Sequence, residues 1–322
     1  MTESPAIATS AAALDAAFAE GAGAAWVERD VITVEGPDAT SYLQGQLSQN
    51  VEALADGEST VSLLLQPQGK IDAYLRVTRT GPDSFALDTD PGHGAGTLAR
   101  LERFKLRVDC ELSVATVPML AVRGPAATDP DAVGVSPAAG ALVVPALWPG
   151  AVGFDVLGSA ATVAGADTAA VATIDGEAVV VGDAADIDRV RIAVGVPAMG
   201  SELGASTIPA AAGIVDDAVD FTKGCYVGQE LVARIDSRGA KTAARLCRMR
   251  IEESAAGDAA PSPEATVEVD GADAGSLTSV AASPDGGWVA LAYIKRKVEV
   301  PATAVIRTDG GAELAATVDP QR

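Results

Sequence analysis

The sequence contains few of the residues from which metal sites and disulfide frameworks are built. Only three cysteines and one histidine occur among its 322 residues. A disulfide framework or a CxxC-type metal site needs more cysteines at closer spacing. A zinc site needs four ligands, and an iron-sulfur cluster usually needs four cysteines. A monomer of this chain is therefore not expected to hold a metal ion or a cluster of its own.

Long apolar runs and aromatic residues are also scarce. No stretch approaches the roughly 18 apolar residues of a membrane-spanning helix. The first five residues carry no positive charge ahead of an apolar segment, which a secretion signal would have. We therefore expect a cytoplasmic protein with no membrane partner. Because 48% of the residues are hydrophobic and only 4% aromatic, the core must consist mainly of Ala, Val, Leu and Ile.

Basic residues are outnumbered, and the formal net charge is -21 at pH 7. Duplex nucleic acid binds through phosphate neutralisation by Lys and Arg, so it is not an expected partner. The basic residues are nevertheless clustered. Between Lys223 and Arg250, seven basic residues stand against two acidic ones, and a second run consists of Arg100, Arg103, Lys105 and Arg107. Such clusters indicate an anionic small ligand, a defined partner surface, or a solvated face with ion pairs.

The most chemically specific segment is KGCYVGQE, residues 223–230. Thiolate is the reactive form of cysteine, and a nearby ammonium or helix N-terminus lowers its pKa from a free value of about 8.5. Lys223 could supply the ammonium for Cys225, and the apolar spacing after Gly228 predicts a helix that begins there. Gly224 and Gly228 allow close approaches that side chains would block. We expect a reactive thiol, and the alternative is a buried structural cysteine beside an ordinary turn.

This octapeptide and its continuation, Leu231 to Arg234 and Ser237 to Gly239, resemble the signature of the YgfZ-type folate-binding proteins. These proteins are relatives of the glycine-cleavage aminomethyltransferase. Further segments resemble other motifs of the family, in the family order, from about residue 26 to the end of the chain. They are Tyr42–Val51, Gln68–Lys70 with Leu75–Val77, and Arg189–Pro197 with Ile208–Pro209.

The resemblance implies an α+β protein with the aminomethyltransferase-like folate-binding fold. In this fold two interlocked α+β subdomains and a C-terminal antiparallel β-barrel are arranged around a central opening. The residue pattern agrees at the C-terminal end, where six short strand signals between Arg245 and Val318 predict a small barrel. We expect residues 1–25 to form an arm or short helix, 26–117 and 118–240 to form the two subdomains, and 241–322 to form the barrel.

A repeated pattern of strand, Gly-Pro and helix supports a pair of related subdomains. The first copy has a strand at Trp26–Val34, then Gly36, then a helix through Leu47 with Asp38 as its N-cap. The second copy has a strand that ends at Arg123, followed by Gly124-Pro125, and we expect a helix there too.

Enzymatic aminomethyl transfer is disfavoured by one short segment. The relatives that perform it carry Gly-Gly-Ile-x-Asp-Asp, whose acidic residue lies beside the folate nitrogens and is needed for the reaction. Here residues 69–74 read GKIDAY, so both acidic positions are lost and Asp72 is displaced by one residue to the opposite face of a strand. Proton handling needs a carboxyl within hydrogen-bond reach. A glutamate common in the family is also replaced, by Ala193.

The resemblance therefore implies a monomeric accessory protein rather than an enzyme. Such a protein would bind tetrahydrofolate or a derivative and assist the assembly, maintenance or repair of iron-sulfur clusters in client or assembly proteins. Cys225 would be its functional thiol, with Lys223 lowering the pKa. The residues expected to contact folate are Gln44, Gln46, Lys70, Tyr74, Arg191, Gly224, Tyr226, Gly228, Gln229, Glu230, Arg234 and Arg238. The alternatives are a folate-dependent one-carbon transferase or demethylase, and a folate-binding scaffold whose cysteine only packs.

Overall fold

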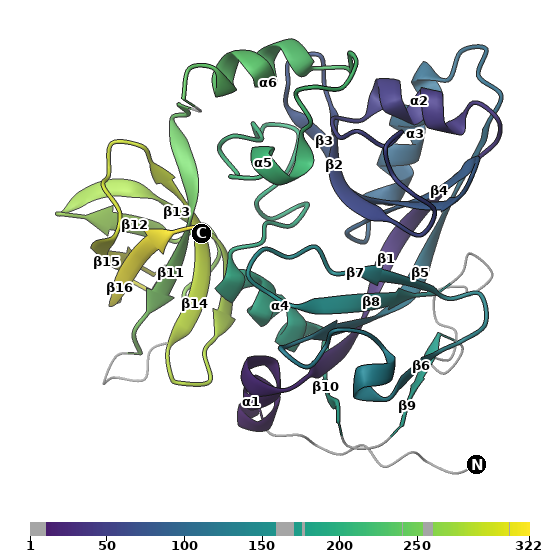
Figure 1. Ribbon diagram of the computed structural model, residues 1–322. Coiled ribbons are helices and arrows are strands. Elements are labelled where there is room, and N and C mark those ends of the chain that lie inside the picture. Colours follow the sequence, from purple (N-terminus) through teal and green to yellow (C-terminus); the bar gives the residue numbers. More distant parts are fainter. Residues whose placement is uncertain (1–10, 159–170, 176–177, 240, 254–259, 309) are drawn as a thin grey trace.

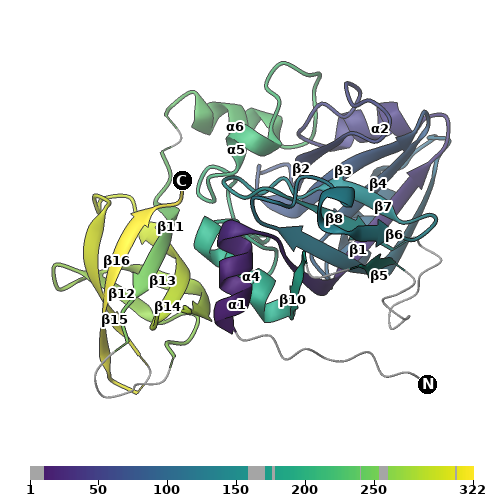
Figure 2. The ribbon, with the colours of Figure 1, turned by 60° about the horizontal axis from the view of Figure 1, so that its bottom comes forward.

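The computed structural model describes residues 11–158, 171–175, 178–239, 241–253, 260–308 and 310–322. These residues form a large mixed sheet with helices packed against it and a separate β-barrel at the C-terminal end (Figure 1). In Figure 2, helices α1 (Ala11–Glu20) and α4 (Ala184–Val194) lie between the sheet and the barrel. The expected α+β fold with a C-terminal barrel is confirmed.

The main sheet has eight strands, seven of them in the order β2-β3-β4-β1-β5-β8-β7. The eighth, β10, pairs in parallel with the start of β1, and the other neighbours are antiparallel. A further small sheet joins β6 (Val135–Pro137) to β9 (Ala172–Ile174). The strands of the main sheet are β1 (Gly23–Glu35), β2 (Ser59–Leu65), β3 (Ile71–Gly81), β4 (Ser84–Thr89), β5 (Glu111–Arg123), β7 (Leu142–Pro145), β8 (Gly153–Leu157) and β10 (Val180–Gly182).

Strands β1 and β5 join the two halves of the sheet. They pair along their whole length, from Gly23 opposite Arg123 to Glu35 opposite Glu111. The expected subdomain boundary after residue 117 falls within β5, so the two halves share one continuous sheet. The division of the chain into subdomains stays a proposal, and residues 1–10 of the expected N-terminal arm lie outside the described residues.

The helices are short, and the packing of their apolar faces fixes their places. Helices α2 (Ala39–Gln46) and α3 (Gly94–Phe104) cover a core that includes Tyr42, Leu43 and Leu101. Helix α4 begins at a capping box between Asp183 and Asp186 and ends at the left-handed Gly195. Among the described residues, no helix is both long enough and apolar enough to cross a bilayer. The remaining helical segments are η1 (Asp131–Val133), α5 (Val215–Ala218) and α6 (Gln229–Asp236).

The strand, Gly-Pro and helix pattern is right for the first copy and wrong for the second. Gly36 and Gly124 both have positive φ, and a Cβ on either would collide with a carbonyl of a neighbouring segment. After Gly36 the chain enters α2, although the Asp38 carboxylate accepts the N–H of Asp109 instead of capping the helix. After Gly124 the chain turns, because the N–H of Ala126 bonds to the carbonyl of Gly21 at 2.9 Å, and no α-helix follows directly.

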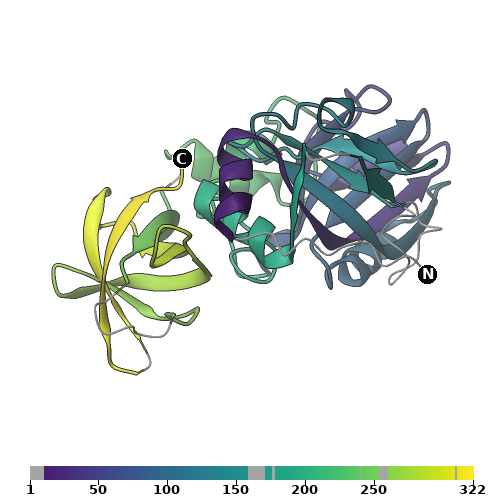
Figure 3. The ribbon, with the colours of Figure 1, turned by 90° about the horizontal axis from the view of Figure 1, so that it is seen from below.

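The C-terminal strands close into a barrel in the order β11-β14-β13-β12-β15-β16, as the six strand signals predicted. Figure 3 shows the barrel beside the rest of the molecule. Alternate residues point inward, for example Cys247, Met249 and Ile251, and fill the interior. Helix α4 packs on β13 and β14, which attaches the barrel to the rest of the molecule. The strands are β11 (Ala244–Ile251), β12 (Thr266–Val269), β13 (Ala272–Ala282), β14 (Trp288–Lys295), β15 (Ala302–Arg307) and β16 (Glu313–Pro320).

Candidate functional site

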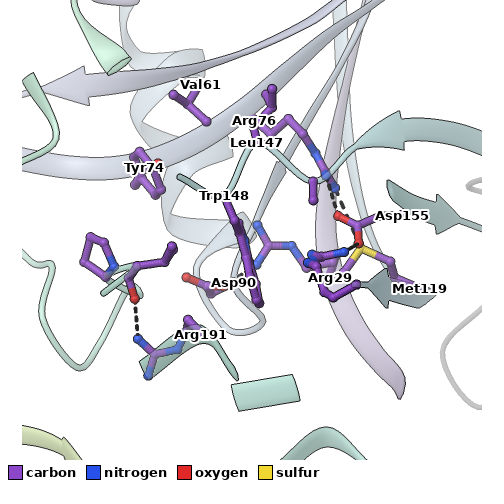
Figure 4. A pocket seen from close by; sticks show the side chains of 14 residues that line it. Arg29, Val61, Tyr74, Arg76, Asp90, Met119, Leu147, Trp148, Asp155 and Arg191 are labelled. Atoms are coloured by element: carbon purple, nitrogen blue, oxygen red, sulfur yellow. Dashed lines mark hydrogen bonds and ion pairs between the residues drawn. The ribbon is translucent and has the colours of Figure 1, made fainter. Parts of the chain in front are cut away.

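A pocket of about 560 Å³ lies between the main sheet and α4. Strand β1 contributes Arg29, β5 contributes Met119 and Arg123, and α4 contributes Arg191, while Trp148 follows β7. A recess of about 80 Å³, lined by six of the same residues, adjoins it. Pockets of this total size are typical of small-molecule sites. The further side chains of the recess, drawn in Figure 4, include Tyr74, Arg76 and Asp155.

A chain of buried ion pairs forms one wall of the pocket. Arg76 donates from Nε to Asp88 at 2.8 Å and from a terminal nitrogen to Asp155. Arg123 donates to the other oxygen of Asp155 at 2.7 Å, and Arg29 donates to Asp88 at 3.0 Å. Charges as deeply buried as these persist only when they are paired. The wall is therefore rigid and its charges are largely neutralised.

The pocket contains carboxylates after all, supplied by strands other than β3. Asp155 lies on β8, and Asp90 follows β4. Burial alone would raise the pKa of Asp155, but its two guanidinium partners outweigh burial and hold the pKa below the usual value. Both oxygens of Asp90 also accept hydrogen bonds, one from Arg29 and one from the N–H of Met199 at 2.8 Å. Sequence reasoning did not place these two carboxylates in the pocket, and neither of them is free.

Tyr74 occupies the pocket-facing position of β3, and the two residues before it face away. Asp72 pairs with Arg100 of α3 at 3.1 Å, and Ala73 is fully buried in the core beneath α2 and α3. A register shift between β2 and β3 next to Asp72 turns both residues toward the helices. Burial raises the pKa of Tyr74, so its hydroxyl stays protonated.

Arg123 and Trp148 leave unused binding capacity in the pocket wall. The guanidinium carbon of Arg123 lies 4.1 Å from the centroid of the Trp148 ring. Burial lowers the pKa of this arginine, although Asp155 opposes that effect. Its Nε is buried and has no hydrogen-bond partner among the described residues. A buried donor without an acceptor is costly, so this atom favours a ligand that carries an acceptor.

Arg191 connects the pocket to the barrel. It donates to Glu202 at 3.0 Å and to Ser279 of β13 at 3.0 Å, and Ser279 in turn donates to Glu202 at 2.6 Å. The Glu202 side chain is fully buried. Burial would lower the pKa of Arg191, but the carboxylates of Glu202 and Asp188 outweigh burial and raise it. One side chain thus touches both the pocket and the barrel.

The loop that contains Cys225 lies elsewhere, against the C-terminal end of α2. The ammonium of Lys223 donates to the carbonyls of Gln44, Leu47 and Gln49 at 2.7, 2.6 and 3.0 Å. Burial lowers the pKa of Lys223 to about 8, while the charges of nearby acidic residues oppose the shift. Three acceptors use all three ammonium protons. Lys223 therefore holds the loop in place, and its effect on the thiol stays a prediction.

Cys225 itself is exposed, so it is not a core cysteine. Helix α6 begins at Gln229 as predicted, with Gly228 as its N-cap at a φ of +84°. A Cβ on Gly228 would lie 2.5 Å from the carbonyl oxygen of Gln66, so the turn between β2 and β3 packs directly on this loop. The other two cysteines, Cys110 and Cys247, are buried in separate cores, and burial raises the pKa of both thiols.

The predicted folate contacts fall into two groups. We call the pocket beside α4 and its adjoining recess together the central pocket. Tyr74 lines the recess, and Arg191 lines both parts. Near the cysteine loop, Gln44 accepts the N–H of Val51 at 3.0 Å and Gln229 accepts that of Tyr226 at 3.3 Å. No member of this second group lines the central pocket, and its role in folate binding stays a prediction. Its other members are Gln46, Lys70, Gly224 and Gly228, together with Arg238 and the exposed ion pair of Glu230 and Arg234.

Sequence reasoning missed most of the pocket wall, namely Arg29, Asp90, Arg123, Trp148 and Asp155. A usable signal was present in two cases. Asp155 stands between Phe154 and Val156, and Arg123 ends an apolar run. A single charge inside an apolar strand indicates a buried ion pair. Which two strands would bring such charges together depends on the sheet order, which the pattern does not give.

Comparison with known proteins adds the family context. A family model for the GCVT N-terminal domain matches residues 28–130. The tRNA-modifying protein YgfZ of Edwardsiella ictaluri is 28% identical over 305 residues, covering 90% of this chain and 88% of that protein. The mitochondrial iron-sulfur cluster assembly factor IBA57 homolog of Neurospora crassa is 29% identical over 227 residues, covering 66% of this chain and 49% of that protein.

A solved structure supports the fold. The glycine cleavage system aminomethyltransferase T from Bartonella henselae superposes with a TM-score of 0.75 at 21% identity, covering 94% of this chain and 86% of that one. At that identity the likeness concerns the fold alone. The family model, the relatives and the motif order agree with one another, and the predicted resemblance to the YgfZ-type, aminomethyltransferase-related proteins is confirmed.

Proposed function

We propose that this protein binds tetrahydrofolate or a derivative in the central pocket and assists the assembly, maintenance or repair of iron-sulfur clusters. The pocket holds the folate, and the exposed thiol of Cys225 is presented to client or assembly proteins. One relative supports this reading by name, as an iron-sulfur cluster assembly factor homolog. In this proposal the protein is an accessory factor and not an enzyme.

The pocket residues fit a reduced folate. Trp148 offers an aromatic face for the pteridine, and the unpaired Nε of Arg123 offers a donor for a ring acceptor. Val27, Ala121 and Ile187 give an apolar surface for the aminobenzoyl group. When bound, the folate would supply a carrier for one-carbon units. The chain's own residues bind it, orient it and exclude water.

The observation that carries the accessory role is the pairing of the pocket carboxylates. Both oxygens of Asp155 accept from guanidinium groups, and both oxygens of Asp90 accept hydrogen bonds. Asp155 is a poor general acid or base for this reason, because accepting a proton would break a buried ion pair. The pocket is therefore built to bind and not to transfer protons.

The first test separates binding from use of the thiol. Tetrahydrofolate is titrated into the parent, Trp148→Ala and Cys225→Ser by calorimetry, and each variant is also tested for restoring iron-sulfur enzyme activity in a deletion strain. We expect Trp148→Ala to weaken binding by about tenfold or more, as expected for a lost aromatic contact. Cys225→Ser should bind folate as the parent does yet fail to restore the enzymes. Full restoration by Cys225→Ser would contradict the role of the thiol.

A folate-dependent one-carbon transferase is the second candidate, and the presence of Asp90 in the pocket favours it. The purified protein is incubated with tetrahydrofolate and an aminomethyl donor, and methylene-tetrahydrofolate is measured. We expect no turnover. Turnover that is lost in Asp90→Asn and kept in Cys225→Ser would establish the transferase instead.

A further inference from the structure

A second concave surface lies outside the central pocket, beside helix α3. It is a groove of about 570 Å³ between α3 and the turn that joins β2 to β3. We call it the α3 groove and define it by Gln66, Gln68, Asp72, Arg100, Arg103 and Phe104. None of these residues lines the central pocket, so the α3 groove is a separate feature.

Arg100 forms the base of the α3 groove. Its Nε donates to Asp72 at 3.1 Å, a terminal nitrogen donates to the carbonyl of Leu65 at 3.2 Å, and its guanidinium lies 3.9 Å from the centroid of the Phe104 ring. The other terminal nitrogen is buried and has no partner among the described residues. The side chain is thus fixed, with part of its donor capacity unused.

The end of α3, which lines the groove with Arg103 and Phe104, and the residues directly after α3 are basic and apolar on a strongly acidic protein. Arg103 and Arg107 are exposed, and no ion pair to either occurs among the described residues. Between and beside them, Phe104 is 41% exposed and Leu106 is 79% exposed, the highest exposure of the large apolar side chains described. Arg107 has a φ of +59°, an uncommon conformation for a residue other than glycine. A solvated face with ion pairs would not explain these features. Arg103 and Arg107 have no ion-pair partner among the described residues, and the side chains of Phe104 and Leu106 are exposed to solvent.

The α3 groove also lies next to the cysteine loop. Gln66 lines the groove, and its carbonyl oxygen packs on Gly228, three residues after Cys225. A Cβ on Gly69 of the same turn would lie 3.0 Å from the Cβ of Leu231 in α6. A partner seated in the groove would therefore lie against the turn whose other side holds the loop with the exposed thiol.

We propose that the α3 groove, together with the residues directly after α3, docks an acidic segment of a partner protein, one that carries an apolar side chain among its carboxylates. Arg103 and Arg107 meet the carboxylates, and Phe104 and Leu106 cover the apolar side chain. A protein segment is favoured over nucleic acid because single strands bind by stacking bases on aromatic faces, whereas Arg100 already covers one face of the Phe104 ring and Leu106 offers no ring. The identity of this partner as an iron-sulfur client rests on the proposed function, whereas the docking itself does not.

The test uses a fluorescein-labelled dodecapeptide of ten glutamates around two central leucines, with binding followed by fluorescence polarisation. We expect saturable binding to the full-length parent that weakens as salt increases. The double variant Arg103→Glu/Arg107→Glu should weaken binding by about tenfold or more, and Leu106→Ser by several-fold. The matched control is Arg250→Glu on the barrel, an exposed arginine, and it should change binding by less than about twofold.

Further binding and competition experiments distinguish between the molecules that could bind in the α3 groove. The same peptide with serines in place of the leucines should bind several-fold more weakly, because the apolar contact is lost. Free triglutamate and a single-stranded RNA dodecamer should compete poorly. The proposal is overturned if the peptide does not bind, if the double variant binds it like the parent, or if the RNA displaces it more effectively than unlabelled peptide. The assay involves neither folate nor Cys225, so its failure would leave the proposed function standing, and loss of folate binding would leave the docking result intact.

Discussion

At the scale of single residues, the hydrogen-bond and ion-pair partners of a side chain determine its chemistry in this protein. Lys223 donates its three ammonium protons to the carbonyls of Gln44, Leu47 and Gln49. It is thus a structural clamp for the cysteine loop, and its effect on the pKa of the thiol stays a prediction. The thiol itself is exposed at the surface.

The clamp predicts a pH dependence of stability. Burial lowers the pKa of Lys223 to about 8 from 10.5, so between these values the folded protein binds fewer protons than the unfolded chain. The stability of the parent relative to Lys223→Met should therefore rise as pH increases from about 8 to 10.5, and it should stay level below about 8, where Lys223 is protonated in both states. The slope is at most about 1.4 kcal/mol per pH unit.

Urea unfolding of both proteins at several pH values measures this difference. Lys241→Met is the matched control, because Lys241 is exposed. Its stability relative to the parent should stay nearly constant over the same range. A constant difference for Lys223→Met as well would show that the ammonium is not desolvated by the loop.

The buried ion pairs of the pocket wall predict a large stability effect. Asp155→Ala would leave the guanidinium groups of Arg76 and Arg123 without their shared carboxylate. Removing one partner of a buried pair costs about 3–5 kcal/mol. Urea unfolding should show this loss, whereas Asp285→Ala, which breaks an exposed pair with Arg250, should change stability little. Equal effects of the two substitutions would mean that the pocket wall is solvated.

At the scale of elements, we expect the contact between the β2–β3 turn and the cysteine loop to be the most sensitive to substitution. Gly228 has positive φ, and a Cβ there would lie 2.5 Å from the Gln66 carbonyl oxygen. Gly239 has a similar φ of +77°, but a Cβ there meets nothing within 4 Å. Both alanine variants bear the φ cost of about 1 kcal/mol. Only Gly228→Ala adds the collision.

We therefore expect Gly228→Ala to lower the melting temperature clearly more than Gly239→Ala. The alkylation rate of Cys225 by iodoacetamide should also change in Gly228→Ala and remain at the parent value in Gly239→Ala, because only the first variant displaces the loop. Identical melting temperatures and alkylation rates for the two variants would remove the packing of turn on loop from this account.

Local sequence patterns predicted individual helices and strands well, but they did not predict which of these elements contact one another. The six strands of the barrel and the start of α6 follow from alternation and spacing alone. The helix expected after Gly124 does not form, because the backbone there bonds to Gly21, more than 100 residues earlier in the chain. Asp90 and Asp155 could not be assigned to the pocket for the same reason. Their neighbours are set by sheet order, which no local window contains.

At the scale of the whole molecule, Arg191 ties the pocket to the barrel through Glu202 and Ser279. Ligand binding and barrel attachment should therefore share this residue. We expect Arg191→Met to speed amide hydrogen exchange in β13 and to weaken folate binding together, because a buried carboxylate would lose its cation. Ser279→Ala, which removes a single neutral hydrogen bond, should have a smaller effect on both. Weakened folate binding with unchanged exchange in β13 would separate the two roles.

The sequence motifs had suggested a single site for folate binding and for the thiol, but Cys225 does not line the pocket. In the proposed function, the pocket between the sheet and α4 binds folate and the loop against α2 presents the thiol. Val61 and Tyr74, however, both line the recess of the pocket and pack against the hydrophobic cluster that includes Tyr226 of the cysteine loop.

The most direct test is a crystal structure of the protein with bound tetrahydrofolate. The account predicts that the pteridine packs on Trp148, with an acceptor atom within hydrogen-bond distance of the Arg123 Nε, and makes no contact with Cys225. A pteridine bound against the loop of residues 223–230, with the pocket beside α4 empty, would contradict it.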